Sequence, residues 1–182
     1  MTCVVAVEHK GKVFMAADSL MSDGENCWVV REPKCWRHHS EFVIGVAGMS
    51  RAIAALRLHL DPPSVPRRGV ERWVGVDLIA ALDRAFKLAA IGVPGEAAGE
   101  IPERFPCEIL VGVAGRVWSI DPSGYHCSTN DGHAATGTGH AWAMGSLDAT
   151  TGQAPKTRLR AALAAAEAHS VYVRRPFRYT SI

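Results

Sequence analysis

The sequence predicts an α+β protein of packed layers, with two antiparallel sheets and two pairs of helices. The main observation is the order of segments along the chain, which is strands, two helices, strands, two helices and a closing strand. Runs of β-branched residues, separated by turn residues at hairpin spacing, indicate that neighbouring strands pair antiparallel. No repeat with a period of about 20 to 50 residues is present, so a solenoid is not expected.

The strands before the first helix are expected to form one sheet. Residues 2–7 and 13–17 are predicted to form a hairpin around the turn Lys10-Gly11-Lys12. A polar segment follows, and further short strands are expected at 27–30, 34–36 and 42–47. The second sheet is predicted from a hairpin at 107–114 and 116–120 and from a closing strand at 170–173.

The helices are predicted from apolar residues at helical spacing. Ser50 is expected to cap the first helix, which stops at Asp61-Pro62-Pro63. Its apolar side is expected to consist of Ile53, Leu56, Leu58 and Leu60. The other helices are expected at 77–88, 139–149 and 156–168, and residues 92–106 are expected to form a loop.

Length and composition describe an ordinary globular chain. The 182 residues fit one domain over residues 1–182. Hydrophobic residues make up 48% and charged residues 21%, which excludes a disordered or collagen-like chain. The formal charge is +2 and the Lys and Arg residues are scattered, so no nucleic-acid partner is expected. No apolar run approaches the roughly 20 residues that cross a bilayer, so no membrane span is expected.

Cysteines and histidines give no signal for a metal site. The five cysteines form no CxxC pair, and their odd number without a secretory signal predicts reduced thiols in a cytoplasmic protein. Adjacent His38 and His39 would face opposite sides of a strand, and the sevenfold spacing of three later histidines recurs by chance. No metal and no required cofactor are therefore expected.

Thr2 is the first candidate catalytic residue. Methionine aminopeptidases cut before small residues, and Thr2 would then carry both a hydroxyl and an α-amine. An α-amine has an unperturbed pKa of about 7.7 to 8.0, so it can accept the hydroxyl proton near neutral pH. Nucleophile and base would then belong to one residue. Many proteins begin Met-Thr for no catalytic reason, so the hypothesis depends on further residues.

A longer pattern continues from this threonine through Thr2-Cys3-Val4-Val5-Ala6-Val7, Gly11-Lys12-Val13, Ala16-Ala17-Asp18-Ser19, Gly24 and Lys34. It resembles the opening of proteasome β-subunits and of the bacterial peptidase HslV. In that family an aspartate and a lysine occur 16 and 32 residues after the nucleophile, and Asp18 and Lys34 have these offsets from Thr2. A lysine ammonium near the hydroxyl favours the alkoxide, and a carboxylate fixes the lysine. Considered singly, Asp18 would be a turn residue and Lys34 a solvated strand residue.

Two glycine-containing segments extend the resemblance. The run Phe42-Val43-Ile44-Gly45-Val46-Ala47-Gly48 is similar to the family's strand and Ala-Gly turn, which implies that the Gly48 N–H is the oxyanion donor. The alternative is a turn glycine before a helix. Gly137-Thr138-Gly139 stands where the family usually has Gly-Ser-Gly, so Thr138 offers a hydroxyl that would help the N-terminal amine. Alternatively, Thr138 caps the following helix.

The similarity spans nearly the whole chain, through 109–113, 117–124 and 136–145, and becomes loose over 164–173. There Ser170 is given a weak supporting role and Glu167 none. Cys3 is expected to point away from the site and to pack in the core, because side chains alternate along a strand.

The resemblance implies a four-layer αββα sandwich, two sheets flanked by helix pairs, with threonine-type endopeptidase activity. Ser22, Ala47 and Met49 would flank a bound peptide, and Met21, Glu32 and Trp36 would lie near the first specificity pocket. A homo-oligomer, as a ring or spiral, is expected to act on peptides or unfolded proteins. The family also allows an ATP-dependent unfoldase as partner and a monovalent cation at backbone carbonyls.

Two alternatives keep the same fold. The chain can be a catalytically inactive structural or assembly subunit, although the presence of Thr2, Asp18 and Lys34 speaks against this. It can also be an N-terminal-nucleophile amidohydrolase that acts on a non-peptide amide. Activity on small amides but not on peptides would favour that second alternative.

Overall fold

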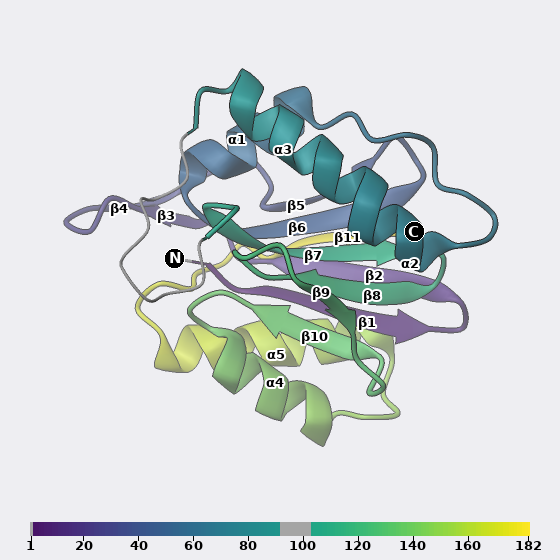
Figure 1. Ribbon diagram of the computed structural model, residues 1–182. Coiled ribbons are helices and arrows are strands. Elements are labelled where there is room, and N and C mark those ends of the chain that lie inside the picture. Colours follow the sequence, from purple (N-terminus) through teal and green to yellow (C-terminus); the bar gives the residue numbers. More distant parts are fainter. Residues whose placement is uncertain (1, 92–102) are drawn as a thin grey trace.

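The computed structural model describes residues 2–91 and 103–182. Two antiparallel sheets lie against each other, and a layer of helices covers each outer face (Figure 1). The predicted α+β fold with layers αββα is therefore confirmed. Met1 and residues 92–102 of the predicted loop lie outside the described residues.

The two large sheets contain strands from distant parts of the chain. The four-stranded sheet has the order β10-β1-β2-β11, with β1 at Val4–His9, β2 at Lys12–Ala17, β10 at His133–Thr136 and β11 at Arg178–Ser181. The five-stranded sheet has the order β5-β6-β7-β8-β9, with β5 at Cys35–His38, β6 at Phe42–Gly48, β7 at Cys107–Val113, β8 at Arg116–Ile120 and β9 at His126–Ser128. A separate hairpin pairs β3, Leu20–Ser22, with β4, Cys27–Val29.

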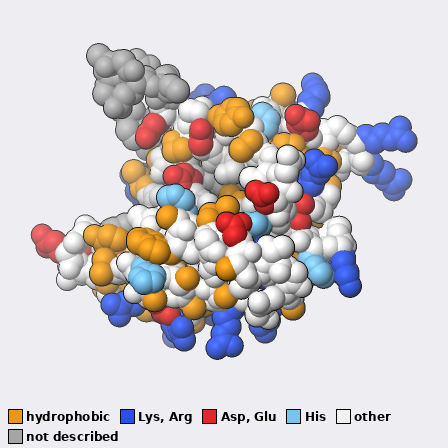
Figure 2. All heavy atoms as spheres, turned by 90° about the horizontal axis from the view of Figure 1, so that it is seen from below, with side chains coloured by type: hydrophobic (Ala, Val, Ile, Leu, Met, Phe, Trp, Pro, Cys, Tyr) orange, Lys and Arg blue, Asp and Glu red, His pale blue; other side chains and the backbone are white. Residues whose placement is uncertain are grey.

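The helices form the two outer layers. On the five-stranded sheet lie α1 at Ser50–His59, α2 at Val70–Arg72, the π-helical turn η1 at Trp73–Leu78 and α3 at Ile79–Leu88. On the four-stranded sheet lie α4 at His140–Ala149 and α5 at Pro155–His169. On the outer face of this second layer, Lys and Arg side chains stand around the outline, with apolar patches between them (Figure 2).

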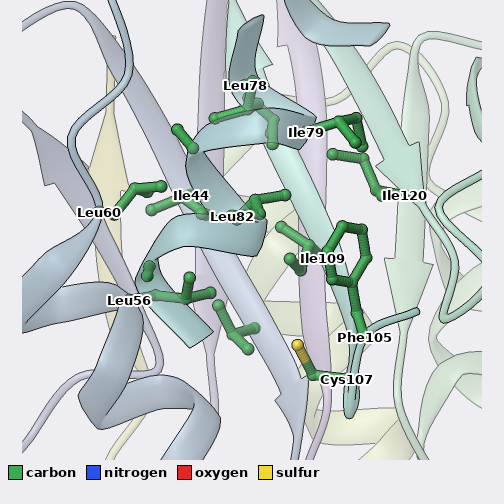
Figure 3. Close-up of a cluster of buried hydrophobic side chains, with 14 of the residues drawn as sticks. Ile44, Leu56, Leu60, Leu78, Ile79, Leu82, Phe105, Cys107, Ile109 and Ile120 are labelled. Carbon is green, nitrogen blue, oxygen red and sulfur yellow. The ribbon is translucent and has the colours of Figure 1, made fainter. Parts of the chain in front are cut away.

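Three clusters of buried side chains fill the three spaces between the layers. Figure 3 shows part of the first, where α1 and α3 pack on the five-stranded sheet through residues such as Leu56, Leu82 and Ile109. The second fills the space between α4, α5 and the four-stranded sheet, and the third lies between the two sheets. Because apolar burial is the main stabilising term in folding, these clusters fix the position of β1 in the middle of the molecule.

The alternating side chains of β1 face two different clusters. Val4 and Ala6 belong to the cluster between the sheets, whereas Cys3 and Val5 pack toward α4 and α5. Cys3 is fully buried, as predicted. A side chain at Gly45 would lie 2.5 Å from Val4 Cγ1, so the glycine lets the two sheets approach closely at the start of β1.

Several predicted elements are corrected by the structure. Residues 170–173 are not a strand, because Ser170 and Val173 belong to the turn by which the chain leaves α5; the last strand is β11, which pairs with β2. Ser50 does not cap α1: the helix begins at Ser50, after the N-cap Met49, without a side-chain cap bond. Leu58 is 76% exposed, because it lies two residues from buried Leu56 and Leu60 and therefore on the other side of the helix.

Contrary to the prediction, the strands before the first helix do not form one sheet. They are divided, because β1 and β2 belong to the four-stranded sheet, β5 and β6 to the five-stranded sheet, and β3 and β4 to the separate hairpin. Other differences concern where elements begin. The second helical segment starts at Val70 rather than at residue 77, after Gly69 with a φ of 74°. The strands β3, β9 and β10 lie in segments for which no strand was expected. His38 and His39 do not face opposite sides: their ring centroids are 4.2 Å apart, because His39 leaves the strand with a φ of 44°.

No helix within 2–91 and 103–182 is both long and apolar enough to cross a membrane. In the same two ranges, no group of three or more His, Cys, Asp or Glu side chains is arranged to hold a metal ion.

Candidate active site

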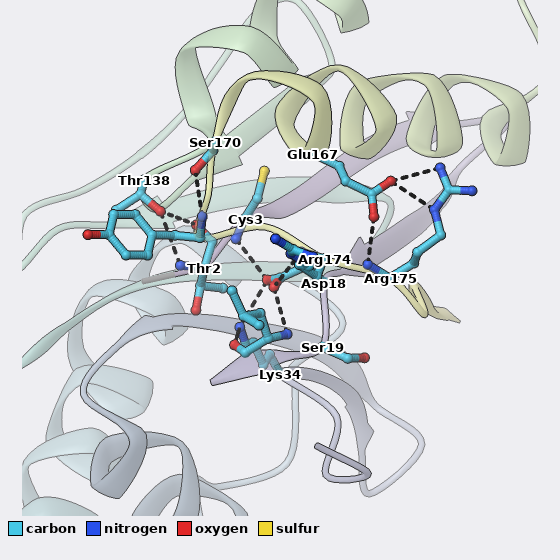
Figure 4. Close-up of polar contacts among 12 residues, drawn as sticks. Thr2, Cys3, Asp18, Ser19, Lys34, Thr138, Glu167, Ser170, Arg174 and Arg175 are labelled. Carbon is cyan, nitrogen blue, oxygen red and sulfur yellow. Dashed lines mark hydrogen bonds and ion pairs between the residues drawn. The ribbon is translucent and has the colours of Figure 1, made fainter. Parts of the chain in front are cut away.

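Thr2 lies two residues before the start of β1 at Val4, at the point where two surface cavities meet. Thr2 is 1% exposed, and it lines both cavities together with Gly48 and Met49. Because β1 is paired on one side with β2 and on the other with β10, the position of Thr2 is set by two strands. Figure 4 shows Thr2 between Thr138 and the pair formed by Asp18 and Lys34.

Asp18 and Lys34 form a buried ion pair below Thr2. Asp18 Oδ1 lies 3.0 Å from Lys34 Nζ and also accepts the N–H of Cys3 at 3.0 Å. Its other oxygen, Oδ2, accepts the N–H of Leu20 at 2.9 Å and that of Arg174 at 3.5 Å. Lys34 Nζ also donates to the carbonyl of Leu20. The carboxylate thus fixes both the lysine and the backbone next to Thr2.

Burial changes the acidity of two groups in this cluster. Burial lowers the pKa of Lys34 below its ordinary value of 10.5, and the attraction of Asp18 opposes this shift. Burial, followed by the repulsion of Asp18, raises the pKa of the Cys3 thiol to about 12. The thiol therefore stays protonated and unreactive at neutral pH, which excludes it as the nucleophile.

The Thr138 hydroxyl contacts the backbone of Thr2. The nitrogen of Thr2 lies 3.3 Å from Thr138 Oγ1, and this hydroxyl donates to the Thr2 carbonyl at 3.2 Å. The neighbouring glycines permit the close approach. A side chain at Gly137, where φ is 88°, would lie 2.3 Å from the Thr2 carbonyl oxygen, and one at Gly139 would lie 2.9 Å from Cys3 Cβ. The alternative of a helix cap does not hold, because α4 has Gly139 as its N-cap and no side-chain cap bond.

Gly48 ends β6 and lines both cavities together with Thr2. It pairs with Cys107 on β7 and has a φ of 151°, which favours glycine. A side chain here would lie 2.7 Å from the Cα of Cys107 and from the Pro106 carbonyl oxygen. The backbone of Gly48 therefore forms the wall of the cleft at the level of Thr2.

The first cavity has a volume of about 690 Å³ and extends from Thr2 toward β3 and α1. Four of the predicted substrate-binding residues line it, namely Met21, Ser22, Glu32 and Met49. Trp28, on β4, also lines it and is 49% exposed. Trp36 is not brought to this place: it lies on β5 and packs against the cluster between the five-stranded sheet and its helices.

The second cavity has a volume of about 540 Å³ and lies on the other side of Thr2. It includes Ala47, which was predicted to flank the substrate, and Thr138. It also includes Glu108, which the sequence did not single out. Glu108 Oε2 accepts the N–H of Gly137 at 2.9 Å and the hydroxyl of Thr136. Its position on β7, directly before an apolar run, gave no sign of this contact.

Ser170 and Glu167 contact residues of their own C-terminal segment. Ser170 Oγ accepts the N–H of Tyr172 at 3.2 Å, and Glu167 pairs with Arg175 at 2.8 Å. The backbone N–H of Arg174, which reaches Asp18, comes from the same segment. That contact could not be read from the sequence, because any residue type can supply it.

Two antiparallel sheets between two layers of helices form the fold of N-terminal-nucleophile hydrolases of the proteasome and HslV type. The chain has this fold, in agreement with the resemblance found in the sequence.

Solved structures with this fold come from several organisms. The BPH of Thiobacillus denitrificans in complex with epoxomicin has a TM-score of 0.79 and 17% identity, over 100% of this chain and 98% of that chain. Eukaryotic HslV from Trypanosoma brucei has a TM-score of 0.68 and 21% identity, over 99% and 98%. A Gly-1 mutant of Anbu from Hyphomicrobium sp. strain MC1 has a TM-score of 0.72 and 17% identity, over 98% and 80%. No family model and no curated protein matches the sequence. At these identities the likeness shows the fold alone.

Proposed function

We propose that the protein is a threonine-type endopeptidase with Thr2 as its nucleophile once Met1 is removed. One observation carries the proposal. Thr2 lies where the Thr138 hydroxyl, the buried pair of Asp18 and Lys34, and two cavities come together. A buried lysine with a lowered pKa beside a cleft is typical of functional sites.

In the first step, Thr2 Oγ attacks the scissile carbonyl and its proton passes to the α-amine of the same residue. With Met1 removed, the nitrogen that lies 3.3 Å from Thr138 Oγ1 is this amine. The Thr138 hydroxyl orients the amine and relays the proton. The Lys34 ammonium stabilises negative charge on Oγ, and Asp18 keeps the lysine in place.

The oxyanion that forms on the substrate accepts a hydrogen bond from the Gly48 N–H. A preorganised backbone donor of this kind lowers the barrier by about 2.7–4 kcal/mol. When the tetrahedral intermediate collapses, the C–N bond breaks and the Thr2 ammonium gives its proton to the leaving amine. Water then attacks the ester on Oγ, with the α-amine again as base, and releases the acid.

The first cavity is suited to the acyl half of a peptide. Met21 and Trp28 supply apolar contact area, and the carboxylate of Glu32 is balanced by nearby Arg51 and Arg57. We therefore propose that apolar side chains are preferred on this side. Ser22, Ala47 and Met49 would flank the peptide backbone.

The biological setting belongs to the same proposal. We propose that copies of the chain assemble into a ring or spiral and degrade unfolded protein in the cytoplasm. An ATP-dependent unfoldase fits this role as a partner, and a monovalent cation bound by backbone carbonyls fits it as an accessory ion. The likeness to HslV of Trypanosoma brucei supports the choice of this class over other hydrolases.

The deciding experiment is the intact mass of the purified protein before and after incubation with epoxomicin, a peptide epoxyketone. The BPH of Thiobacillus denitrificans forms a complex with this compound, which motivates its use as the probe. We expect the mass of the chain without Met1, then one inhibitor adduct. The variant Thr2→Ala should not form the adduct. The matched control Thr150→Ala, which lies away from the site, should still form it. Retained Met1 without an adduct would favour the inactive subunit, and an adduct with turnover of small amides alone would favour the amidohydrolase.

A further inference from the structure

The second cavity is lined by acidic residues that have no role in the proposed reaction steps. Its lining includes Thr2, Gly48 and Thr138 on the catalytic side and Phe105, Pro106 and Pro122 as apolar wall. It also includes Glu103, Glu108 and His140. No Lys or Arg belongs to the described residues that line it. The first cavity, in contrast, includes Arg51 and Arg57 together with Asp23 and Glu32.

The position of the Thr2 nitrogen assigns this cavity to one half of the substrate. Thr138, which contacts that nitrogen, lines the second cavity and not the first. The proton that the leaving amine receives must come from the Thr2 amine, so the two nitrogens must come within hydrogen-bond reach. The second cavity therefore holds the leaving half of the substrate, which becomes the new N-terminus.

Glu108 is held in place at the edge of this cavity. Both of its hydrogen bonds, from the Gly137 N–H and the Thr136 hydroxyl, fall on Oε2. Oε1 has no protein donor among the described residues, and the side chain is exposed. A carboxylate that is fixed in this way binds a cation with little loss of side-chain freedom.

Nearby cations do not neutralise the cavity. Arg104 follows Glu103 in sequence, but its guanidinium is paired with both carboxylate oxygens of Asp83 on α3. His140 Nδ1 lies 3.0 Å from the Gly137 carbonyl oxygen. The two glutamates therefore give the lining of the cavity an acidic character.

We propose that Glu108 and Glu103 select substrates with a lysine or arginine side chain within the first two residues after the scissile bond. The inference rests on the proposed peptidase function and adds a specificity to it. The aliphatic stem of such a side chain packs on Pro106, Pro122 and Met49, while its charged end reaches the carboxylates.

Internally quenched peptides test this preference directly. They share one acyl half and carry Lys, Gln or Glu at the first or the second position after the bond that is cut. An exposed charge pair changes an equilibrium or rate ratio by about 1.4- to 5-fold. The measured quantity is the ratio of kcat/KM for the Lys and Gln peptides, because the fraction of active enzyme cancels in it. We expect a ratio of about five in the wild type, a lower value for the Glu peptide, and a decline of the ratio with added salt.

Variants locate the source of the preference. Glu108→Gln keeps an acceptor for Gly137 and Thr136 but removes the charge, and Glu103→Lys reverses a second charge. Each should lower the Lys-to-Gln ratio, and the double variant should bring it to one or below. Glu71→Gln, on α2 at the other end of the molecule, is the matched control and should keep the wild-type ratio (Figure 1).

The outcomes separate this inference from the function on which it rests. Cleavage of all peptides at equal rates, or a ratio that Glu108→Gln and Glu103→Lys leave unchanged, would overturn the specificity and leave the peptidase intact. Absence of any cleavage, together with no epoxomicin adduct, would overturn the peptidase and the specificity with it.

Discussion

Asp18 and Lys34 form an ion pair that is almost completely shielded from solvent, with 3.0 Å between Oδ1 and Nζ and exposed fractions of 0% and 4%. The same carboxylate accepts N–H groups from Cys3, Leu20 and Arg174. Three segments far apart in the chain are thus joined at one side chain. Substitution of either partner should affect both the stability of the fold and the chemistry at Thr2.

Asp18→Asn should destabilise the protein strongly. The change leaves the Lys34 ammonium buried without its counter-charge, and breaking a buried pair in this way costs about 3–5 kcal/mol. Urea unfolding followed by circular dichroism measures the loss. The control Asp61→Asn concerns an exposed side chain, for which a change within about 0.5 kcal/mol is expected. Equal midpoints for both variants would contradict the structural role of Asp18.

The pH dependence of peptide cleavage should have two limbs. Below about pH 8 the α-amine is protonated and cannot act as a base, so kcat/KM rises with pH there. On the alkaline side Lys34 loses its positive charge, so kcat/KM decreases again. Because burial lowers the pKa of Lys34, the midpoint of this decrease should lie below the ordinary value of 10.5. Removal of Asp18 takes away the attraction that raises this pKa, so in Asp18→Asn the limb should move to lower pH. A limb at or above 10.5 would exclude Lys34 as the titrating group.

Thr138→Val should slow the formation of the epoxomicin adduct, because valine has nearly the shape of threonine but lacks its hydroxyl. The variant removes the hydroxyl that contacts the Thr2 nitrogen and carbonyl. A hydrogen bond contributes about 0.5–1.5 kcal/mol, which corresponds to a roughly 2- to 12-fold lower rate of epoxomicin adduct formation. Thr138→Ser keeps the hydroxyl and should retain the rate within about twofold. If the serine variant were as slow as the valine variant, the methyl group rather than the hydroxyl would be responsible.

Gly48→Ala should destabilise the protein and reduce turnover. The new methyl would meet the backbone of Cys107 and Pro106 at 2.7 Å, at a φ of 151° that favours glycine. Strained backbone positions of this kind cost about 1–3 kcal/mol. The control Gly145→Ala lies in α4 with no heavy atom within 4 Å of the new methyl, and there helix propensity predicts a gain of about 0.5–1 kcal/mol. Thermal melts compare the two, and a loss of similar size in both would refute the steric explanation.

The sequence predicted the parts of the fold whose pattern is local. The hairpin of β1 and β2, the apolar strand β6 and the helices α4 and α5 each have a signal in their own local sequence, and each lies within a few residues of its predicted place. Asp18, Lys34, Gly48 and Thr138 were expected near Thr2 from their positions in a family pattern, and the structure brings them together.

The rest depends on contacts that a local pattern does not contain. The strand β10, with the sequence His-Ala-Ala-Thr, is made of residues without strong strand preference and is extended because it pairs with β1. The edge strand β11 is charged and largely exposed, so it lacks the alternation that marks a strand. Trp36 was misplaced because its family position did not reveal that its ring packs on the core under α1.

The contact between Thr2 and Thr138 joins residues 136 positions apart, and the one between Asp18 and Arg174 joins residues 156 positions apart. A ribosome that has made the first half of the chain has therefore already made Thr2, Asp18 and Lys34. It has made neither the strand that flanks β1 on its other side nor the segment that closes over Asp18. Under the proposed function, an unfinished chain therefore carries Thr2 without two of the contacts of its site, and the site is complete only once the C-terminal segment has been made.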